Sequence, residues 1–145
     1  MPEIDSLIGR RLLSASVVAG AVGVLLIGAA AHAQPTAQAP GVTRADLQRH
    51  DLSIAGREAI QVRVDFRPGA YAPKHTHPGE EIVYVLKGSL QYEVEGKPPV
   101  TLKAGDVLFV PAGTVHAARN VGRDDASELA TYVVEKGKPL STPAK

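Results

Sequence analysis

The chain has 145 residues, which is close to the usual size of one domain. Sixteen Lys and Arg residues against fifteen Asp and Glu residues give a formal net charge of +1, which lacks the positive field that nucleic-acid binding needs. Cys is absent, so disulfides and thiolate nucleophiles are excluded, and any metal ion must be held by His, Asp or Glu.

The first 33 residues have the pattern of a secretory signal peptide. The pair Arg10-Arg11 precedes an uncharged segment over residues 17–31, and Ala31-His32-Ala33 provides a small-x-small cleavage site. We therefore expect removal of residues 1–33 and a periplasmic or secreted mature protein. The paired arginines also resemble, in part, a twin-arginine signal, so both the Sec and the twin-arginine route stay open.

The alternative is an uncleaved membrane anchor, because residues 12–31 approach the roughly 20 apolar residues that span a bilayer. Ser and Gly residues make this segment only modestly hydrophobic, and an anchor does not need a cleavage site. We expect no stable membrane insertion of the mature chain.

Residues 34–46 begin with a run rich in Pro, Ala and Gln that has no apolar periodicity, which predicts a flexible linker. The stretch 44–50 is compatible with a single helical turn or with the start of the first strand. The folded domain is expected over residues 47–135, and the last ten residues, 136–145, form a predicted frayed tail that contains two prolines.

The dominant period within the domain is two. Apolar and polar residues alternate over residues 60–66 and 90–94, and more weakly over 129–133, where Leu129, Thr131 and Val133 form the expected buried face. Gly- and Pro-rich turn signals separate these segments, and no helix of three turns is visible after the signal peptide. The pattern predicts an all-β sandwich or barrel of antiparallel strands.

The segment 82–86 is apolar on both faces, which is typical of a strand that is covered on both sides. We expect a homodimer in which a second copy covers Ile82, Tyr84 and Leu86. The alternative is that the N-terminal segment folds back over this face.

The chemistry is concentrated in three histidines and one carboxylate. His75 and His77 are two residues apart, so on an extended strand both imidazoles leave the same face, which is a spacing suited to metal ligands. His116 follows a Pro-Ala-Gly turn at 111–113 that can return it to the same cavity.

The next strand contains two carboxylates, Glu80 and Glu81. Only one of them can point inward, because neighbouring residues on a strand face opposite sides of the sheet. If Val83 and Val85 line the interior, Glu81 shares their face and Glu80 points outward.

Ten positions carry a family resemblance. Five of them resemble the first motif of the cupins, with five, one, three and six residues between successive members: Gly69, His75, His77, Glu81 and Gly88. The other five resemble the second cupin motif, with intervals of five, one, two and three residues: Gly105, Pro111, Gly113, His116 and Asn120.

The resemblance implies a double-stranded β-helix, which is a small jelly-roll barrel of two antiparallel sheets. It also implies four metal ligands: His75, His77, Glu81 and His116. The motif glycines suit turns that need positive φ, and we interpret Asn120 as structural.

Three imidazoles and one carboxylate suit a divalent transition metal, with Fe or Mn favoured over Ni, Cu and Zn. Four protein ligands leave two positions of an octahedral ion for a small-molecule substrate or ligand. The resemblance to quercetin-dioxygenase-like cupins favours a metalloenzyme of dioxygenase-like type that acts on an oxygenated organic substrate. The alternative is a non-catalytic periplasmic module that binds a small molecule or a metal. No catalytic acid or base is identified, and Tyr71, Tyr92 and Tyr132 are the nearest candidates.

Overall fold

The computed structural model describes residues 39–145, so the predicted signal peptide and residues 34–38 of the predicted linker lie outside it. The described residues form ten strands and no helix, as the sequence predicts for an all-β protein. The strands are β1 (Val42–Asp51), β2 (Arg57–Phe66), β3 (Tyr71–Thr76), β4 (Gly79–Lys87), β5 (Ser89–Val94), β6 (Val100–Lys103), β7 (Val107–Val110), β8 (His116–Asn120), β9 (Ala126–Glu135) and β10 (Thr142–Pro143). In this part of the chain there is also no helix that is long and apolar enough to cross a membrane.

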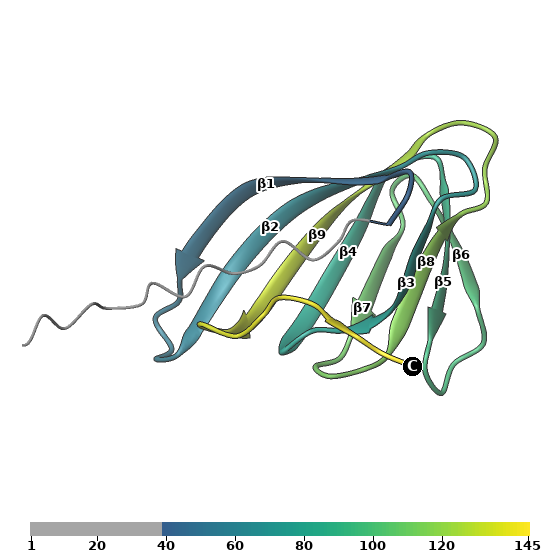
Figure 1. The fold of residues 1–145 in the computed structure, drawn as a ribbon. Helices are drawn as coiled ribbons and strands as arrows, with labels where there is room; N and C mark the ends of the chain where they lie inside the picture. The colour runs from purple at the N-terminus through teal and green to yellow at the C-terminus, as the bar shows by residue number, and fades with distance from the viewer. Residues whose placement is uncertain (1–38) are drawn as a thin grey trace, which may run out of the picture. The chain divides into compact units, whose positions relative to one another are not determined.

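The strands form two five-stranded sheets, and all of the strand pairs are antiparallel (Figure 1). One sheet has the order β1-β2-β9-β4-β7, and the other has the order β10-β3-β8-β5-β6. Strands that are distant in sequence are neighbours, as with β2 and β9 or β3 and β8, which is the arrangement of a jelly roll.

An aliphatic core lies between the two sheets. The alternation over residues 60–66 places Ile60, Val62, Val64 and Phe66 on the inner face of β2, where each is at most 4% exposed. Val83 and Val85 of β4 are fully buried opposite Leu90 and Tyr92 of β5 in the same core cluster. Burying this apolar surface stabilises the sandwich at roughly 25 cal/mol per Å² removed from water.

Two of the predicted boundaries are wrong. β1 begins at Val42, so residues 42–46 belong to the barrel and not to a linker. Of the two alternatives for residues 44–50, the strand is the correct one. β1 is an edge strand that is mostly exposed on both faces, so it carries no apolar alternation that would reveal it. The tail is not frayed either, because β10 pairs with β3.

The predicted orientation of β9 is also wrong. Leu129, Thr131 and Val133 lie half-buried on the outer face, whereas Glu128 and Tyr132 point into the core. β9 lies between β2 and β4, where neighbouring strands partly cover even its outer side chains. Both faces of such a central strand carry apolar residues, so alternation alone does not identify the inner one.

The motif glycines form turns, as predicted. Gly69, Gly88, Gly105 and Gly113 all have φ between +70° and +92°. Two constraints favour glycine at position 88: its positive φ, and the lack of space for a Cβ atom, which would lie 2.7 Å from the Cα of Ala126. Asn120 is structural: its side chain donates to the carbonyls of Phe66 and Asp124 and accepts from the Gly122 N–H.

Candidate metal centre

Three histidines from two neighbouring strands of one sheet converge inside the barrel. His75 lies near the end of β3, His77 directly follows that strand, and His116 begins β8, where it pairs with His75. The candidate ligand nitrogens of the three rings all lie within 4.8 Å of one another. His77 and His116 are buried, and His75 is the half-exposed member.

Glu81 joins this group from the opposite sheet. Its Oε2 lies 3.0 Å from the Nε2 of His116 and 3.4 Å from the Nε2 of His77, and the residue is 3% exposed. Glu81 shares the inner face of β4 with Val83, whereas Glu80 lies on the half-exposed outer face. The structure therefore brings together all four predicted site residues, which we call the histidine cluster: His75, His77, Glu81 and His116.

Hydrogen bonds define which nitrogen of each imidazole faces the cavity. In each ring the Nδ1 lies within hydrogen-bond distance of a backbone carbonyl, and because a carbonyl only accepts, Nδ1 carries the proton. The Nε2 lone pair is then free to bind a metal ion. The bonds run from His75 to Pro73 O at 2.7 Å, from His77 to Leu140 O at 2.6 Å and from His116 to Thr114 O at 2.9 Å.

Among residues 39–145, three buried atoms at the centre have no hydrogen-bond partner: the Nε2 atoms of His77 and His116, and the Oε2 of Glu81. Two nitrogen lone pairs and a carboxylate oxygen repel one another at 3.0–3.4 Å unless a positive charge lies between them. Imidazole nitrogen and carboxylate oxygen are the donors that suit divalent transition metals. The residues present therefore fit such an ion.

Without a metal ion, a proton serves as the positive charge. Burial disfavours the Glu81 carboxylate, but the adjacent His116 and His77 imidazoles outweigh this and hold its pKa below the usual value. Burial also disfavours the charged form of His116, yet the adjacent Glu81 raises its pKa overall. Burial and the charge of His116 lower the pKa of His75 to about 4, so His75 is neutral at pH 7.

A second polar group lines the same cavity, which we call the acid–tyrosine wall: Arg44, Tyr92, Glu128 and Tyr132. The Tyr92 hydroxyl donates to Oε2 of Glu128 at 2.7 Å, and the Arg44 Nη2 donates to the Tyr132 hydroxyl at 3.1 Å. Burial, and then the charge of Glu81, raise the pKa of Glu128 to about 8. The cavity, with a volume of about 30 Å³, is large enough for an ion or a water molecule.

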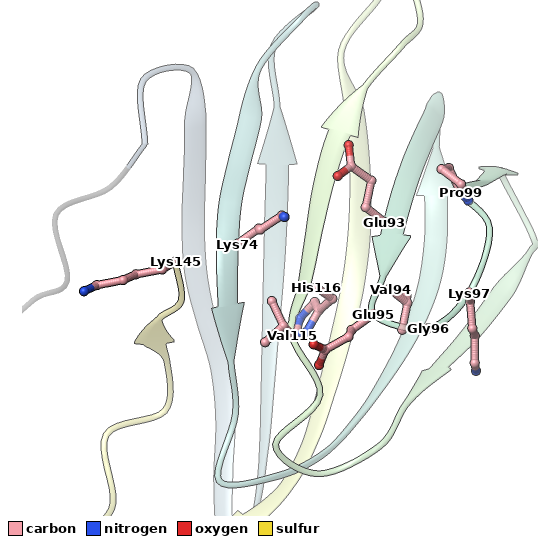
Figure 2. Close-up of a pocket in the computed structure, with 10 residues that line it drawn as sticks. All are labelled: Lys74, Glu93, Val94, Glu95, Gly96, Lys97, Pro99, Val115, His116 and Lys145. Carbon is pink, nitrogen blue, oxygen red and sulfur yellow. The ribbon is translucent and has the colours of Figure 1, made fainter.

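His116 also lines a second, larger hollow of about 340 Å³. Figure 2 shows that the charged ends of Glu93, Lys97 and Lys145 around this hollow point in different directions. These groups do not converge on one point, so we place the chemistry in the smaller cavity.

Residues 62–139 match the family described as a cupin domain. The protein belongs to the cupin family. Among curated proteins, this cupin is 46% identical over 67 residues to the dimethylsulfoniopropionate lyase DddQ of Ruegeria pomeroyi, an alignment that covers 46% of the chain and 33% of the lyase. It is 38% identical over 83 residues to the oxalate-binding protein of Thermotoga maritima, covering 57% of the chain and 68% of that protein.

Among solved structures, this cupin resembles recombinant oxalate oxidase in complex with glycolate, with a TM-score of 0.60 and 26% identity over 77% of the chain and 59% of the oxidase. The chain thus spans a third of the lyase and less than two thirds of the oxidase.

Two residues of the acid–tyrosine wall escape prediction from sequence. Arg44 falls in the segment predicted to be a linker, and Glu128 falls on the face of β9 that was predicted to point outward. Glu128 pairs with the buried Val64 of β2, so knowing that β9 pairs with β2 in this register would have placed Glu128 on the inner face. Tyr71 is not in this cavity, since its ring lies against the Arg119 guanidinium at 4.5 Å.

Proposed function

We propose that this cupin is a metal-dependent enzyme of dioxygenase-like type that acts on a small oxygenated organic acid. In this proposal, the histidine cluster binds the metal ion through the free Nε2 atoms of its imidazoles and the Glu81 carboxylate. An Fe or Mn ion bound there supplies Lewis acidity and exchangeable coordination positions.

The observation that carries the choice of substrate class is the position of Arg44. Its guanidinium lines the metal cavity and makes no ion pair within residues 39–145. Glu81 faces the imidazoles, and Glu128, whose pKa is raised to about 8, is largely uncharged at neutral pH. The Arg44 charge is therefore available for the carboxylate of a ligand, to which Arg can donate two hydrogen bonds.

The names of the related proteins support the same class, because they concern dimethylsulfoniopropionate, oxalate and glycolate, which are all small organic acids. Arg44 is exposed over much of its surface, so it can meet a ligand at the mouth of the cavity. Tyr132, held by Arg44, then orients the ligand beside the histidine cluster.

Glu128 and Tyr92 are the groups that we assign to proton transfer. The carboxyl of Glu128 keeps its proton at neutral pH because burial raises its pKa to about 8. A general acid works best when its pKa lies near the working pH. The Tyr92 hydroxyl, 2.7 Å from Glu128, fixes the orientation of this carboxyl.

The second candidate function is a module that binds a small organic acid without turnover, and the oxalate-binding relative favours it. Elemental analysis of the purified protein tests the metal first. Oxygen uptake and product formation are then measured with oxalate, glycolate, catechols, flavonols and diketones. We expect bound metal and turnover with a small acid. Tight binding without turnover would support the module, and a protein that never takes up metal would exclude the metal-dependent enzyme.

The proposal includes export and assembly. We place the mature protein in the periplasm or outside the cell, which the intact mass of the protein from a periplasmic fraction tests. We also place a homodimer contact on the outer face of β4, where Ile82, Tyr84 and Leu86 are 43–45% exposed and continue onto the exposed Phe109 and Val107 of β7.

Light scattering at micromolar concentration tests the dimer. Tyr84→Glu should produce a monomer, whereas Val121→Glu, which changes an exposed apolar residue elsewhere, should leave the dimer intact. A monomeric wild-type protein would contradict this contact.

A further inference from the structure

The three imidazoles of the histidine cluster are oriented in two different ways. For His75 and His116 the carbonyl that accepts from Nδ1 belongs to the residue two positions earlier in the chain. For His77 the acceptor is the carbonyl of Leu140, which is 63 residues away. Two ligands are thus oriented by their own strand segment, and the third depends on the end of the chain.

The end of the chain is attached on both sides of Leu140. Before it, the Glu135 N–H donates to the Pro78 carbonyl at 3.1 Å, next to His77. After it, β10 pairs with β3, so that Thr142 lies opposite Thr76 and Pro143 opposite His75. These contacts hold the Leu140 carbonyl against His77 from two directions.

Further contacts strengthen this attachment. The Leu140 side chain packs against the hydrophobic core, and the Ala144 N–H donates to the Lys74 carbonyl at 2.9 Å. The yellow end of the chain follows this course from β9 toward β3 in Figure 1. We call residues 136–145 the C-terminal strap.

His77 needs such a partner more than the other two ligands do. It follows the last residue of β3 and precedes the Pro78-Gly79 turn, so the pairing of β3 with β8 does not include it. Its backbone carbonyl accepts from the Gly113 N–H, and its ring lies 4.7 Å from the ring of Tyr132. Neither contact determines which ring nitrogen carries the proton, whereas the Leu140 carbonyl does.

The geometry points to the C-terminal strap as a part of the protein that supports metal binding. The Leu140 carbonyl is the positioning group: it keeps the proton of the His77 ring on Nδ1 and directs Nε2 toward the ion. This role is independent of the substrate. It predicts that metal affinity depends on residues beyond position 139, where the match to the cupin domain ends.

Truncation of the full chain tests this role, with Mn²⁺ as the probe and the EPR signal of the free ion as the readout. A stop after Pro139 removes the carbonyl and should weaken Mn²⁺ binding by about 10- to 100-fold, the usual loss when the partner of a ligand is removed. A stop after Ser141 keeps the carbonyl but loses β10, so it should give a smaller loss. A stop after Ala144 removes only Lys145 and should bind Mn²⁺ like the full chain.

Leu140→Ala is the matched control, because it removes the packed side chain and keeps the carbonyl. It should lower the melting temperature but leave the Mn²⁺ affinity within a few-fold of wild type. If the stop after Pro139 gives a folded protein with unchanged Mn²⁺ affinity, or if Leu140→Ala loses as much affinity as that truncation, the proposal is wrong.

Long-range proton–nitrogen NMR of the histidine rings gives a second readout that does not depend on the truncated chain folding. In the metal-free full chain His77 should be the Nδ1–H tautomer. Ala144→Pro, which removes one hydrogen bond of the strap, should broaden or shift the signals of His77 and leave those of His116 in place. A neutral His77 ring that carries its proton on Nε2 and none on Nδ1 would overturn the assignment.

Discussion

The histidine cluster and the acid–tyrosine wall face each other across one small cavity but are built in different ways. Three of the four cluster residues lie within the seven positions from His75 to Glu81, and backbone carbonyls orient the imidazoles. The residues of the acid–tyrosine wall come from β1, β5 and β9, and hydrogen bonds between their side chains hold them in place. Local spacing therefore encodes the cluster, whereas only strand pairing assembles the wall.

The strongest test that local spacing encodes the histidine cluster is to compare two variants, Glu81→Gln and Glu80→Gln. Glu81→Gln removes the anionic donor that faces the imidazoles in residues 39–145, so bound metal should fall close to zero, as it should in His75→Ala, His77→Ala and His116→Ala. Glu80→Gln changes an adjacent carboxylate on the outer face and should keep wild-type stoichiometry. Elemental analysis of the variants measures this, and equal losses in both Glu variants would contradict the strand register.

The next largest effect concerns Glu128 and the stability of the metal-free protein. The folded pKa of about 8 lies above the ordinary Glu pKa of 4.5, so between these pH values the unfolded chain has lost a proton that the folded chain keeps. Glu128 should therefore lower stability as pH rises from about 5 to 8, by about 1.4 kcal/mol for each pH unit. His75, whose folded pKa of about 4 lies below 6.5, contributes the opposite slope up to about pH 6.5, so the net fall in the wild type should appear between about pH 6.5 and 8.

Glu128→Gln should remove most of this slope and be more stable than wild type at pH 8. Urea unfolding at several pH values measures the effect. Glu93→Gln, which changes an exposed carboxyl on β5, serves as the control and should keep the wild-type slope. A wild-type slope in Glu128→Gln would mean that another group is responsible.

Arg44→Gln tests the wall as a carboxylate-binding surface. It should weaken the binding of oxalate or glycolate to the metal-loaded protein by about 10- to 100-fold, since a hydrogen bond to a charged group contributes about 1.5–3 kcal/mol. Metal content should stay the same, because Arg44 is not a donor to the ion. Calorimetric titration measures the affinity, and Arg63→Gln, at a surface ion pair on the outer side of β2, should have no effect.

The smallest effect is the pH dependence of metal uptake. A protonated imidazole cannot bind a metal ion, and Glu81 raises the pKa of the buried His116 above 6.5, whereas that of His75 is lowered to about 4. Affinity for Mn²⁺ should therefore weaken by up to about tenfold per pH unit as pH falls below the pKa of His116, with His75 contributing only near pH 4. A constant affinity between pH 8 and 6 would contradict this.

The sequence was informative where chemistry depends on nearby residues. The spacing of His75 and His77 and the parity of Glu81 with Val83 predict where these side chains lie, because a strand alternates its faces regularly. Arg44 and Leu140 were missed, since neither an exposed edge strand nor a backbone carbonyl leaves a pattern in residue types. Glu128 was missed because the half-buried outer side chains of β9 resemble an inner face.

The position of Pro143 has a consequence for how the protein behaves at high concentration. β10 forms the outer edge of the sheet that carries His75 and His116, and Pro143 there has no N–H to offer another strand. A two-residue edge strand with a proline is a poor template for pairing with a second molecule, whereas the longer edge of β3 beneath it would be a good one. Removal of the last residues should therefore expose a surface on which barrels add to one another, edge to edge, and precipitate.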